Sequence, residues 1–205
     1  MNRRIALFSV LALMPCTSAS SAPAANRPNI VVILADDLGW SDLGCYGSEI
    51  PTPNIDALAG SGARFRQFYN SARCSPTRCS LLTGLYPQQA AVVPGNPLPD
   101  LRNDNNVTFA ELLGANGYRT YMAGKWHVTT QLKPDGDKSN WPLQRGFDRF
   151  YGFLNGETDQ FTPELVCDNH AVVQPRSVQD GYHFSEDVVD QASGFIRDLK
   201  SLVPE

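Results

Sequence analysis

The feature that most constrains the fold is an unbroken apolar run at residues 30–34, which stops abruptly at Asp36 and Asp37. β-branched and aliphatic residues without polar alternation are typical of a strand that is buried on both faces of a parallel sheet. We therefore predict a strand over residues 29–35 in an α/β sandwich with a mostly parallel central sheet. Acidic side chains at the carboxyl end of such a strand lie where open sheets bind ligands, although an ordinary polar loop explains them equally well.

Helix signals follow along the chain. The prolines of residues 51–54 at the start and Gly62 at the end predict a short helix that begins within residues 51–54. A second helix is expected over residues 76–82, with Cys74 just before its first turn. Thr108 and Glu111 form a capping-box pattern that opens a helix to about residue 116. Ser185 is placed to cap a final helix whose apolar residues fall on one face.

Few strand signals accompany these helices. A short strand is expected over residues 120–123, whereas residues 84–106 and 133–140 are rich in turn formers and polar residues and predict loops. Only two or three strands can be recognised, so the sheet is expected to be incomplete in this chain.

The N-terminal residues 1–25 have the pattern of a signal peptide. Arg3 and Arg4 precede an apolar run at residues 5–14, and Ala22-Pro23-Ala24 fits a small-residue cleavage site; a buried N-terminal helix is the alternative. This apolar run is too short to span a bilayer, and no other segment of the sequence is apolar over a sufficient length. We therefore expect no stable membrane insertion. The protein is expected to be exported, to a periplasm or the medium. A formal charge of -4 without basic clusters argues against nucleic-acid binding.

The segment from Cys74 through Pro76 and Arg78 to Gly84 resembles the signature of type I sulfatases, C-x-P-[ST]-R-x-x-x-L-T-G. It departs slightly, since Thr77 replaces the commoner Ser and Arg73 occupies a position that is usually small or apolar. Residues 117–127, ending GKWH, resemble the second signature. Further matches, in the family's order, lie at residues 36–39, 52–59, 145–152 and 156–160, the last similar to the arylsulfatase branch. The resemblance covers residues 26–205, which we expect to be the N-terminal part of the catalytic domain.

This resemblance implies that a formylglycine-generating enzyme oxidises Cys74 to formylglycine. One hydroxyl of the hydrated aldehyde would attack the sulfur of the substrate, giving a covalent sulfated intermediate. The second hydroxyl would then lose its proton, the aldehyde would re-form and sulfate would leave. Arg78 would hold a formylglycine hydroxyl, Lys125 would contact sulfate oxygens, and His127 would contact the formylglycine hydroxyl and act as the base.

Asp36 and Asp37 resemble half of the family's divalent cation site. Carboxylate ligands favour Ca²⁺ or Mg²⁺ over zinc. In the family the ion is usually Ca²⁺, and it also touches an oxygen of the residue derived from Cys74. The ion would polarise the sulfate and activate the hydroxyl.

Simpler interpretations stay open for each residue. Cys74 could be a buried thiol or half of a disulfide, and Lys125 and His127 could be an ordinary strand end. The remaining residues of these types carry no motif and are expected in structural roles, with cysteine pairing undecided: Cys45, Cys79, Cys167, His170, His183, Trp40, Trp126 and Trp141.

The family's second pair of metal ligands, second histidine and second lysine have no match after His127. We therefore expect an incomplete enzyme that is inactive alone. Three functions remain open at this stage. They are hydrolysis of aryl or carbohydrate sulfate esters, hydrolysis of phosphoesters or phosphonates by a related enzyme, and a non-catalytic truncated product.

Overall fold

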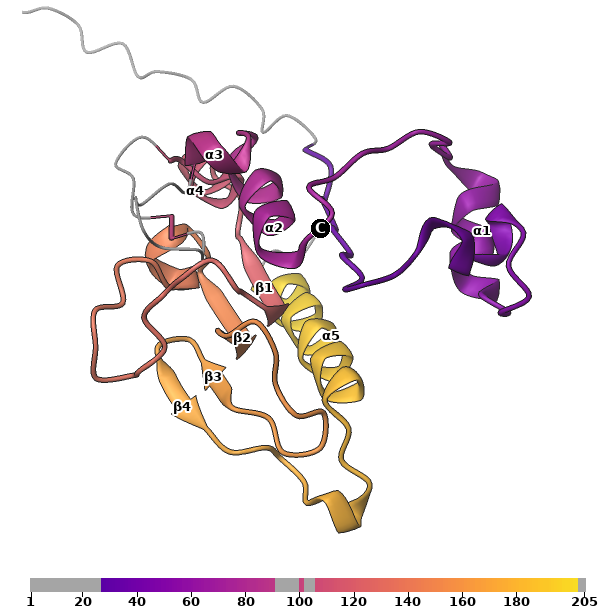
Figure 1. Ribbon diagram of the computed structural model, residues 1–205. Helices are drawn as coiled ribbons and strands as arrows, with labels where there is room; N and C mark the ends of the chain where they lie inside the picture. Colours follow the sequence, from indigo (N-terminus) through magenta and orange to yellow (C-terminus); the bar gives the residue numbers. More distant parts are fainter. Residues whose placement is uncertain (1–26, 91–99, 102–105, 203–205) are drawn as a thin grey trace, which may run out of the picture. The chain divides into compact units, whose positions relative to one another are not determined.

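The computed structural model describes residues 27–90, 100–101 and 106–202 (Figure 1). The expected signal peptide, residues 1–25, lies outside these described residues. The chain divides into two compact units, Met1–Ala35 and Asp36–Glu205. Within the described ranges, no helix combines the length and the apolar character that crossing a bilayer would require.

The strand predicted over residues 29–35 is wrong for this structure. The segment is extended but forms no ladder, and its apolar side chains are exposed, with Ile33 86% accessible. β-branched residues favour a strand locally, but a strand forms only when a neighbouring segment accepts and donates its backbone hydrogen bonds. None of the described segments pairs with it.

The second unit contains a four-stranded sheet in the order β1-β2-β3-β4. The strands are β1 (Tyr121–Lys125), β2 (Arg149–Phe153), β3 (Leu165–Cys167) and β4 (His170–Val172). β1 and β2 are parallel, whereas β3 and β4 add antiparallel neighbours. The predicted α/β class is confirmed, and the described sheet is mixed. Gly152 lies opposite Gly124, and a Cβ at Gly152 would overlap the carbonyl oxygen of Gly124, so this strand pair depends on glycine.

Five α-helices accompany the sheet in the described residues. They are α1 (Pro53–Ser61), α2 (Cys74–Thr83), α3 (Pro87–Ala90), α4 (Phe109–Ala115) and α5 (Phe184–Leu202). The predicted capping box at α4 is confirmed by both reciprocal hydrogen bonds between Thr108 and Glu111. α2 begins earlier than predicted, so Cys74 is its first residue. α5 also begins earlier, which puts Ser185 inside the helix, and α3 interrupts the predicted loop.

The core divides into two clusters that involve opposite faces of β2. Phe150 packs with Trp126, Phe147 and residues of α2, whereas Tyr151 and Phe153 pack with residues of α5. α5 contacts β1 and β2, as Figure 1 also shows. Fewer apolar side chains of α5 are buried than its one-sided pattern predicts. Phe195 is buried, whereas Val189 and Ile196 are exposed.

Candidate active site

The first turn of α2 positions the predicted nucleophile. Arg73 precedes the helix with extended backbone angles and accepts the first helical hydrogen bond, from the Thr77 amide at 3.0 Å. Cys74 is therefore the first helical residue, at the end of the helix where unpaired amide groups favour negative charge. Its side chain is a half-buried free thiol.

Three predicted site residues form one ion-pair cluster. Lys125 donates to one carboxylate oxygen of Asp36 at 2.7 Å, and Arg78 donates to the other at 3.1 Å. Arg78 also donates to the backbone carbonyl of Lys125 at 2.7 Å, which ties α2 to the end of β1. The side chains of both cations are 9% exposed, whereas that of Asp36 is 42% exposed.

The cluster keeps Asp36 ionised. Burial alone would raise the pKa of its carboxyl, but hydrogen bonds from Lys125 and Arg78, with their positive charges, outweigh that effect and hold the pKa below its usual value. Two nearly buried cations and one partly exposed anion leave the cluster with a net positive charge. Such a cluster can attract an anion from solvent.

His127 is fixed from several sides. Its amide donates to the Leu154 carbonyl at 3.1 Å, and its own carbonyl accepts from the Ser75 hydroxyl at 2.6 Å. A Cβ on Gly156 would lie 2.7 Å from His127 Nε2, so the ring occupies space that only glycine leaves free. Nδ1 is buried without a hydrogen-bond partner among the described residues.

The imidazole of His127 is held neutral more strongly than that of an ordinary histidine. Burial lowers its pKa, and the positive charges of Lys125, Arg78 and Arg73 lower it further, while Asp36 opposes them. A neutral imidazole with an unpaired nitrogen can accept a proton.

Backbone strain gathers around this cluster. Among described non-glycine residues with positive φ, three belong to its segments: Asp37 at 54°, Ala72 at 53° and His127 at 57°. The left-handed region is unfavourable for side chains with a Cβ, so surrounding contacts must stabilise it. Observed outliers of this kind often mark functional sites.

The metal-ligand assignment of Asp36 and Asp37 stays a prediction. Asp36 and Asp37 are adjacent carboxylates, and their oxygen donors suit a hard cation in type. Both oxygens of Asp36, however, accept hydrogen bonds from cations. Among the residues that the structure describes, no three His, Cys, Asp or Glu side chains form a metal-binding group. The donors present fit such an ion in kind and fall short in number.

The other cysteines behave as structural thiols. All four cysteines of the described ranges are free, which answers the open pairing question for this structure. Cys79 is fully buried, and burial raises the pKa of its thiol to about 11.

The remaining histidines and tryptophans largely occupy the expected structural positions. Trp126 and Trp141 are buried as expected, whereas Trp40 is exposed and stacks on Tyr46 with ring centroids 4.7 Å apart. His170 is exposed, and His183 Nδ1 accepts from the Ser185 amide.

Two residues that contact His127 were not predicted from the sequence. Ser75 occupies a variable position of the first signature, yet it anchors the backbone of His127. Gly156 lies in the predicted arylsulfatase-like segment, but nothing in the sequence indicates that it packs against His127.

The α/β sheet and the cationic cluster between α2 and β1 define a protein of the sulfatase class. A family model described as Sulfatase matches residues 28–202, and the chain belongs to this family. The chain is 46% identical over 154 residues to human arylsulfatase A, covering 73% of this chain and 30% of that protein. It is 36% identical over 174 residues to an arylsulfatase of Klebsiella aerogenes, covering 80% and 36% respectively. The chain thus spans about a third of the length of these relatives.

Solved structures agree with the fold. The crystal structure of Ps i-CgsB superposes with a TM-score of 0.71 at 29% identity, over 85% of this chain and 42% of that one. A structure solved in complex with its substrate, D-glucosamine-2-N,6-O-disulfate, has a TM-score of 0.64 at 29% identity, over 83% and 31%.

Proposed function

We propose that this protein hydrolyses sulfate esters, using a formylglycine derived from Cys74 as the nucleophile. The observation that carries the proposal is the convergence of Arg78 and Lys125 on Asp36 where α2 meets β1, with the half-buried thiol of Cys74 in the first turn of the same helix. A sulfate ester is anionic, and its sulfur is shielded by oxygens, so its hydrolysis needs a strong nucleophile and preorganised positive charge.

Each residue has a definite task in this proposal. Lys125 binds sulfate oxygens, and Arg78 orients the nucleophile on its own helix, one turn away. Ser75 and Gly156 place His127, whose neutral imidazole takes the proton when sulfate leaves. Removing one such positioned group typically costs about 100-fold to 1,000-fold in rate.

The modification and the ion belong to the same proposal. Cys74 fits oxidation because it is a half-buried free thiol, and formylglycine would supply there an aldehyde hydrate with two hydroxyls on one carbon. Asp36 and Asp37 would hold part of a divalent cation shell, with Ca²⁺ favoured and Mg²⁺ the alternative. Such an ion would supply positive charge to the sulfate.

The decisive experiment is mass spectrometry of the peptide that contains residues 74–78 after co-expression with the formylglycine-generating enzyme. We expect an aldehyde at Cys74, also detected by an aldehyde-reactive probe, and none in Cys74→Ala. Cys79 is the internal control, since it lacks the proline two residues on and is fully buried. An unmodified thiol at Cys74 under these conditions contradicts the proposal.

Substrate chemistry separates sulfatase from the alternative, a phosphoester hydrolase. The relatives named above are arylsulfatases, and one structural neighbour was solved with a sulfated glucosamine. Where the modified protein turns over either substrate, we expect its rate with an aryl sulfate to exceed that with the matching aryl phosphate. The reverse preference would favour the phosphoester function, and absence of both activities would favour a non-catalytic product.

Export is proposed from the N-terminal pattern of residues 1–25. Removal of the first 22–25 residues in the secreted protein is the expected result, and N-terminal sequencing reads it directly. Exported protein that begins at Met1 would contradict it.

A further inference from the structure

An arginine beside the proposed nucleophile has no task in the proposed reaction. Arg73 immediately precedes Cys74, where the first signature usually has a small or apolar residue. Arg73 is exposed, and its backbone carbonyl accepts the first hydrogen bond of α2, from the Thr77 amide. Its side chain makes no ion pair with the residues that the structure describes. An exposed guanidinium of this kind can bind an anion from solvent.

The two other cations of the site are already engaged. The side chains of Arg78 and Lys125 are each 9% exposed, and both bind the carboxylate of Asp36, at 3.1 and 2.7 Å. In the proposed reaction Arg78 orients the nucleophile and Lys125 binds the scissile sulfate. Arg73 therefore adds a positive charge beyond those that the scissile sulfate and the nucleophile use.

The sequence around Arg73 is cationic, although the protein is acidic overall. Residues 57–99 contain four arginines and no Asp, Glu or Lys, whereas the whole chain has a formal charge of -4. No carboxylate close to Arg73 along the chain therefore neutralises it. Its charge also acts at the site: beyond the effect of burial, Arg73 is one of the cations that lower the pKa of His127.

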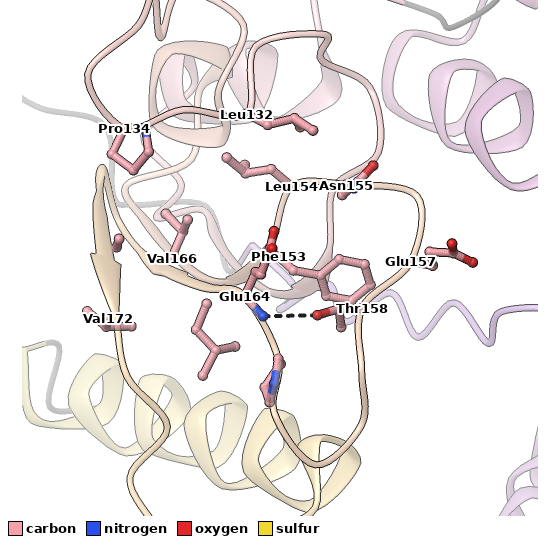
Figure 2. A pocket seen from close by; sticks show the side chains of 13 residues that line it. Leu132, Pro134, Phe153, Leu154, Asn155, Glu157, Thr158, Glu164, Val166 and Val172 are labelled. Atoms are coloured by element: carbon pink, nitrogen blue, oxygen red, sulfur yellow. Dashed lines mark hydrogen bonds between the residues drawn. The ribbon is translucent and has the colours of Figure 1, made fainter.

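The loop after β2 brings the opposite charge to His127. Gly156 in this loop lies against the His127 ring, and its neighbour Glu157 is exposed (Figure 2). Glu157 and Glu164 are the charged residues that line a pocket of about 290 Å³ beside the loop, and no Lys, Arg or His lines it among the described residues. A substrate at His127 thus meets a cation from the start of α2 and carboxylates from the loop after β2.

We propose that Arg73 is a specificity-determining residue that binds a second oxyanion of the substrate, on the carbon next to the one that carries the scissile sulfate. The inference rests on the proposed sulfatase function and deepens it. Consecutive Cα atoms are only about 3.8 Å apart, so a group held by Arg73 lies close to a sulfate held at position 74. The planar guanidinium can bind a carboxylate or a sulfate through two parallel hydrogen bonds. The carboxylates of the loop after β2 repel a second anion on their side, so its position is selected as well as its charge.

The test measures the binding of inert sulfonates to the 205-residue protein by calorimetry. Benzene-1,2-disulfonate presents two anions on adjacent carbons, benzenesulfonate presents one, and benzene-1,4-disulfonate carries the same total charge on opposite carbons. The 1,2 isomer should bind about tenfold more tightly than benzenesulfonate and about fivefold more tightly than the 1,4 isomer. Equal affinities for the two isomers, or no binding of any probe, overturn the proposal.

Arg73→Gln is the decisive variant. The side chain is exposed and the contact with α2 is made by the backbone carbonyl, so the change carries little risk to the fold. The affinity for the 1,2 isomer should fall about tenfold, whereas that for benzenesulfonate should fall less than about twofold. Measurement at about pH 8, above the ordinary histidine pKa of 6.5, keeps His127 neutral in both proteins. A preference for the 1,2 isomer that persists in Arg73→Gln contradicts the proposal.

Arg176→Gln is the matched control. It removes the same charge from another exposed arginine, which acts on Tyr182 rather than on the residues of the candidate site. All three affinities should match those of the native protein. An equal loss of 1,2-disulfonate binding in Arg73→Gln and Arg176→Gln would show that only the total charge of the protein matters, and would overturn the assignment of Arg73.

Failure of this proposal is distinguishable from failure of the proposed function. Sulfonate binding requires neither oxidation of Cys74 nor turnover. Loss of the Arg73 assignment would therefore leave sulfate ester hydrolysis standing. Absence of formylglycine at Cys74 would overturn the hydrolysis while the preference for the 1,2 isomer persisted.

Discussion

Gly156 lies so close to His127 that a Cβ on the glycine would stand 2.7 Å from the Nε2 atom of the imidazole. Carbon and nitrogen atoms that are not bonded do not approach so closely, so either the loop or the ring must move when a side chain is added. This contact joins the loop after β2 to His127, two residues beyond the end of β1. The His127 ring can keep its position only if residue 156 has no side chain.

The first prediction is that Gly156→Ala displaces His127. We expect kcat for an aryl sulfate to fall by at least about tenfold, because small displacements of a proton acceptor lower the rate steeply. The imidazole resonances of His127 should shift in NMR spectra of the same variant.

Gly114→Ala is the control for that variant. A Cβ there meets nothing within 4 Å, and the position lies within α4, where alanine favours the helix. This variant should be more stable by about 0.5–1 kcal/mol, with unchanged activity. Unchanged His127 imidazole resonances in Gly156→Ala, as expected for Gly114→Ala, would contradict the steric role of Gly156.

The second prediction concerns Asp36→Asn. The change leaves Arg78 and Lys125, both nearly buried, without their shared carboxylate. We expect the free energy of unfolding at pH 7 to fall by about 1–2 kcal/mol. The loss is expected to stay this small because Asp36 is partly exposed, so solvent weakens its ion pairs. Urea unfolding followed by circular dichroism measures this difference.

The pH dependence of the Asp36 contribution follows from its lowered pKa. The folded protein binds fewer protons at Asp36 than the unfolded chain, so the contribution is complete above the ordinary carboxyl pKa of 3.8 and is lost as the pH falls through the folded value. The native protein and Asp36→Asn should therefore converge in stability at low pH. A constant difference across the acidic range would contradict the ion-pair assignment.

The third prediction is that His127 titrates below its ordinary value of 6.5. The folded protein then binds fewer protons than the unfolded chain at pH values just under 6.5, so this contribution to stability is complete above 6.5 and lost as the pH falls. Since the neutral imidazole is the proposed base, the acidic limb of the activity profile should also lie below pH 6.5.

Two charge variants test the cause of that shift in opposite directions. Arg73→Gln removes a positive charge and should raise the pKa of His127, whereas Asp36→Asn removes a negative charge and should lower it further. NMR titration of the imidazole Cε1 proton, assigned with His127→Gln, measures both. Lys200→Gln, in the last turn of α5, is the control and should leave the titration unchanged.

Local signals in the sequence predicted the helices better than the strands. The capping box of Thr108 and Glu111 acts within four residues, so α4 could be placed almost correctly. Residues 30–34 have strong strand propensity, but pairing is a long-range requirement that propensity does not contain. β2 was missed because Gly152 is unfavourable in an isolated strand and is explained only by the close approach of Gly124.

The same distinction applies to the site. Arg78 and Lys125 could be predicted from motifs, and the structure brings them together. Asp36 was predicted as a metal ligand, whereas its direct partners in the structure are these two cations. Ser75 contacts a residue 52 positions away through a backbone carbonyl, an interaction that leaves no pattern in side-chain types.

The fourth prediction concerns a buried carboxylate outside the candidate site. Asp187 on α5 is only 2% exposed, and one of its oxygens accepts from the hydroxyl of Tyr151 on β2 at 2.6 Å and from that of Tyr182 at 2.9 Å. Burial and the hydrogen bond to Asp187 raise the pKa of both phenols, so they stay protonated donors at any physiological pH. The Tyr151 hydroxyl thus ties α5 to β2, and the Tyr182 hydroxyl ties the segment just before α5 to the same carboxylate.

Tyr151→Phe and Tyr182→Phe should each lower the free energy of unfolding by about 1–2 kcal/mol, since each removes one hydrogen bond to a buried acceptor. The double variant should lose more than the sum, because either tyrosine alone still leaves the carboxylate one phenolic donor while loss of both takes away the two that the structure shows. Tyr69→Phe alters an exposed ring and should change stability by less than about 0.5 kcal/mol. Chemical unfolding of the four variants and the native protein provides the comparison. Strict additivity of the two single changes would show that the hydroxyls act on Asp187 independently, and would contradict a shared buried network that holds α5 on the sheet.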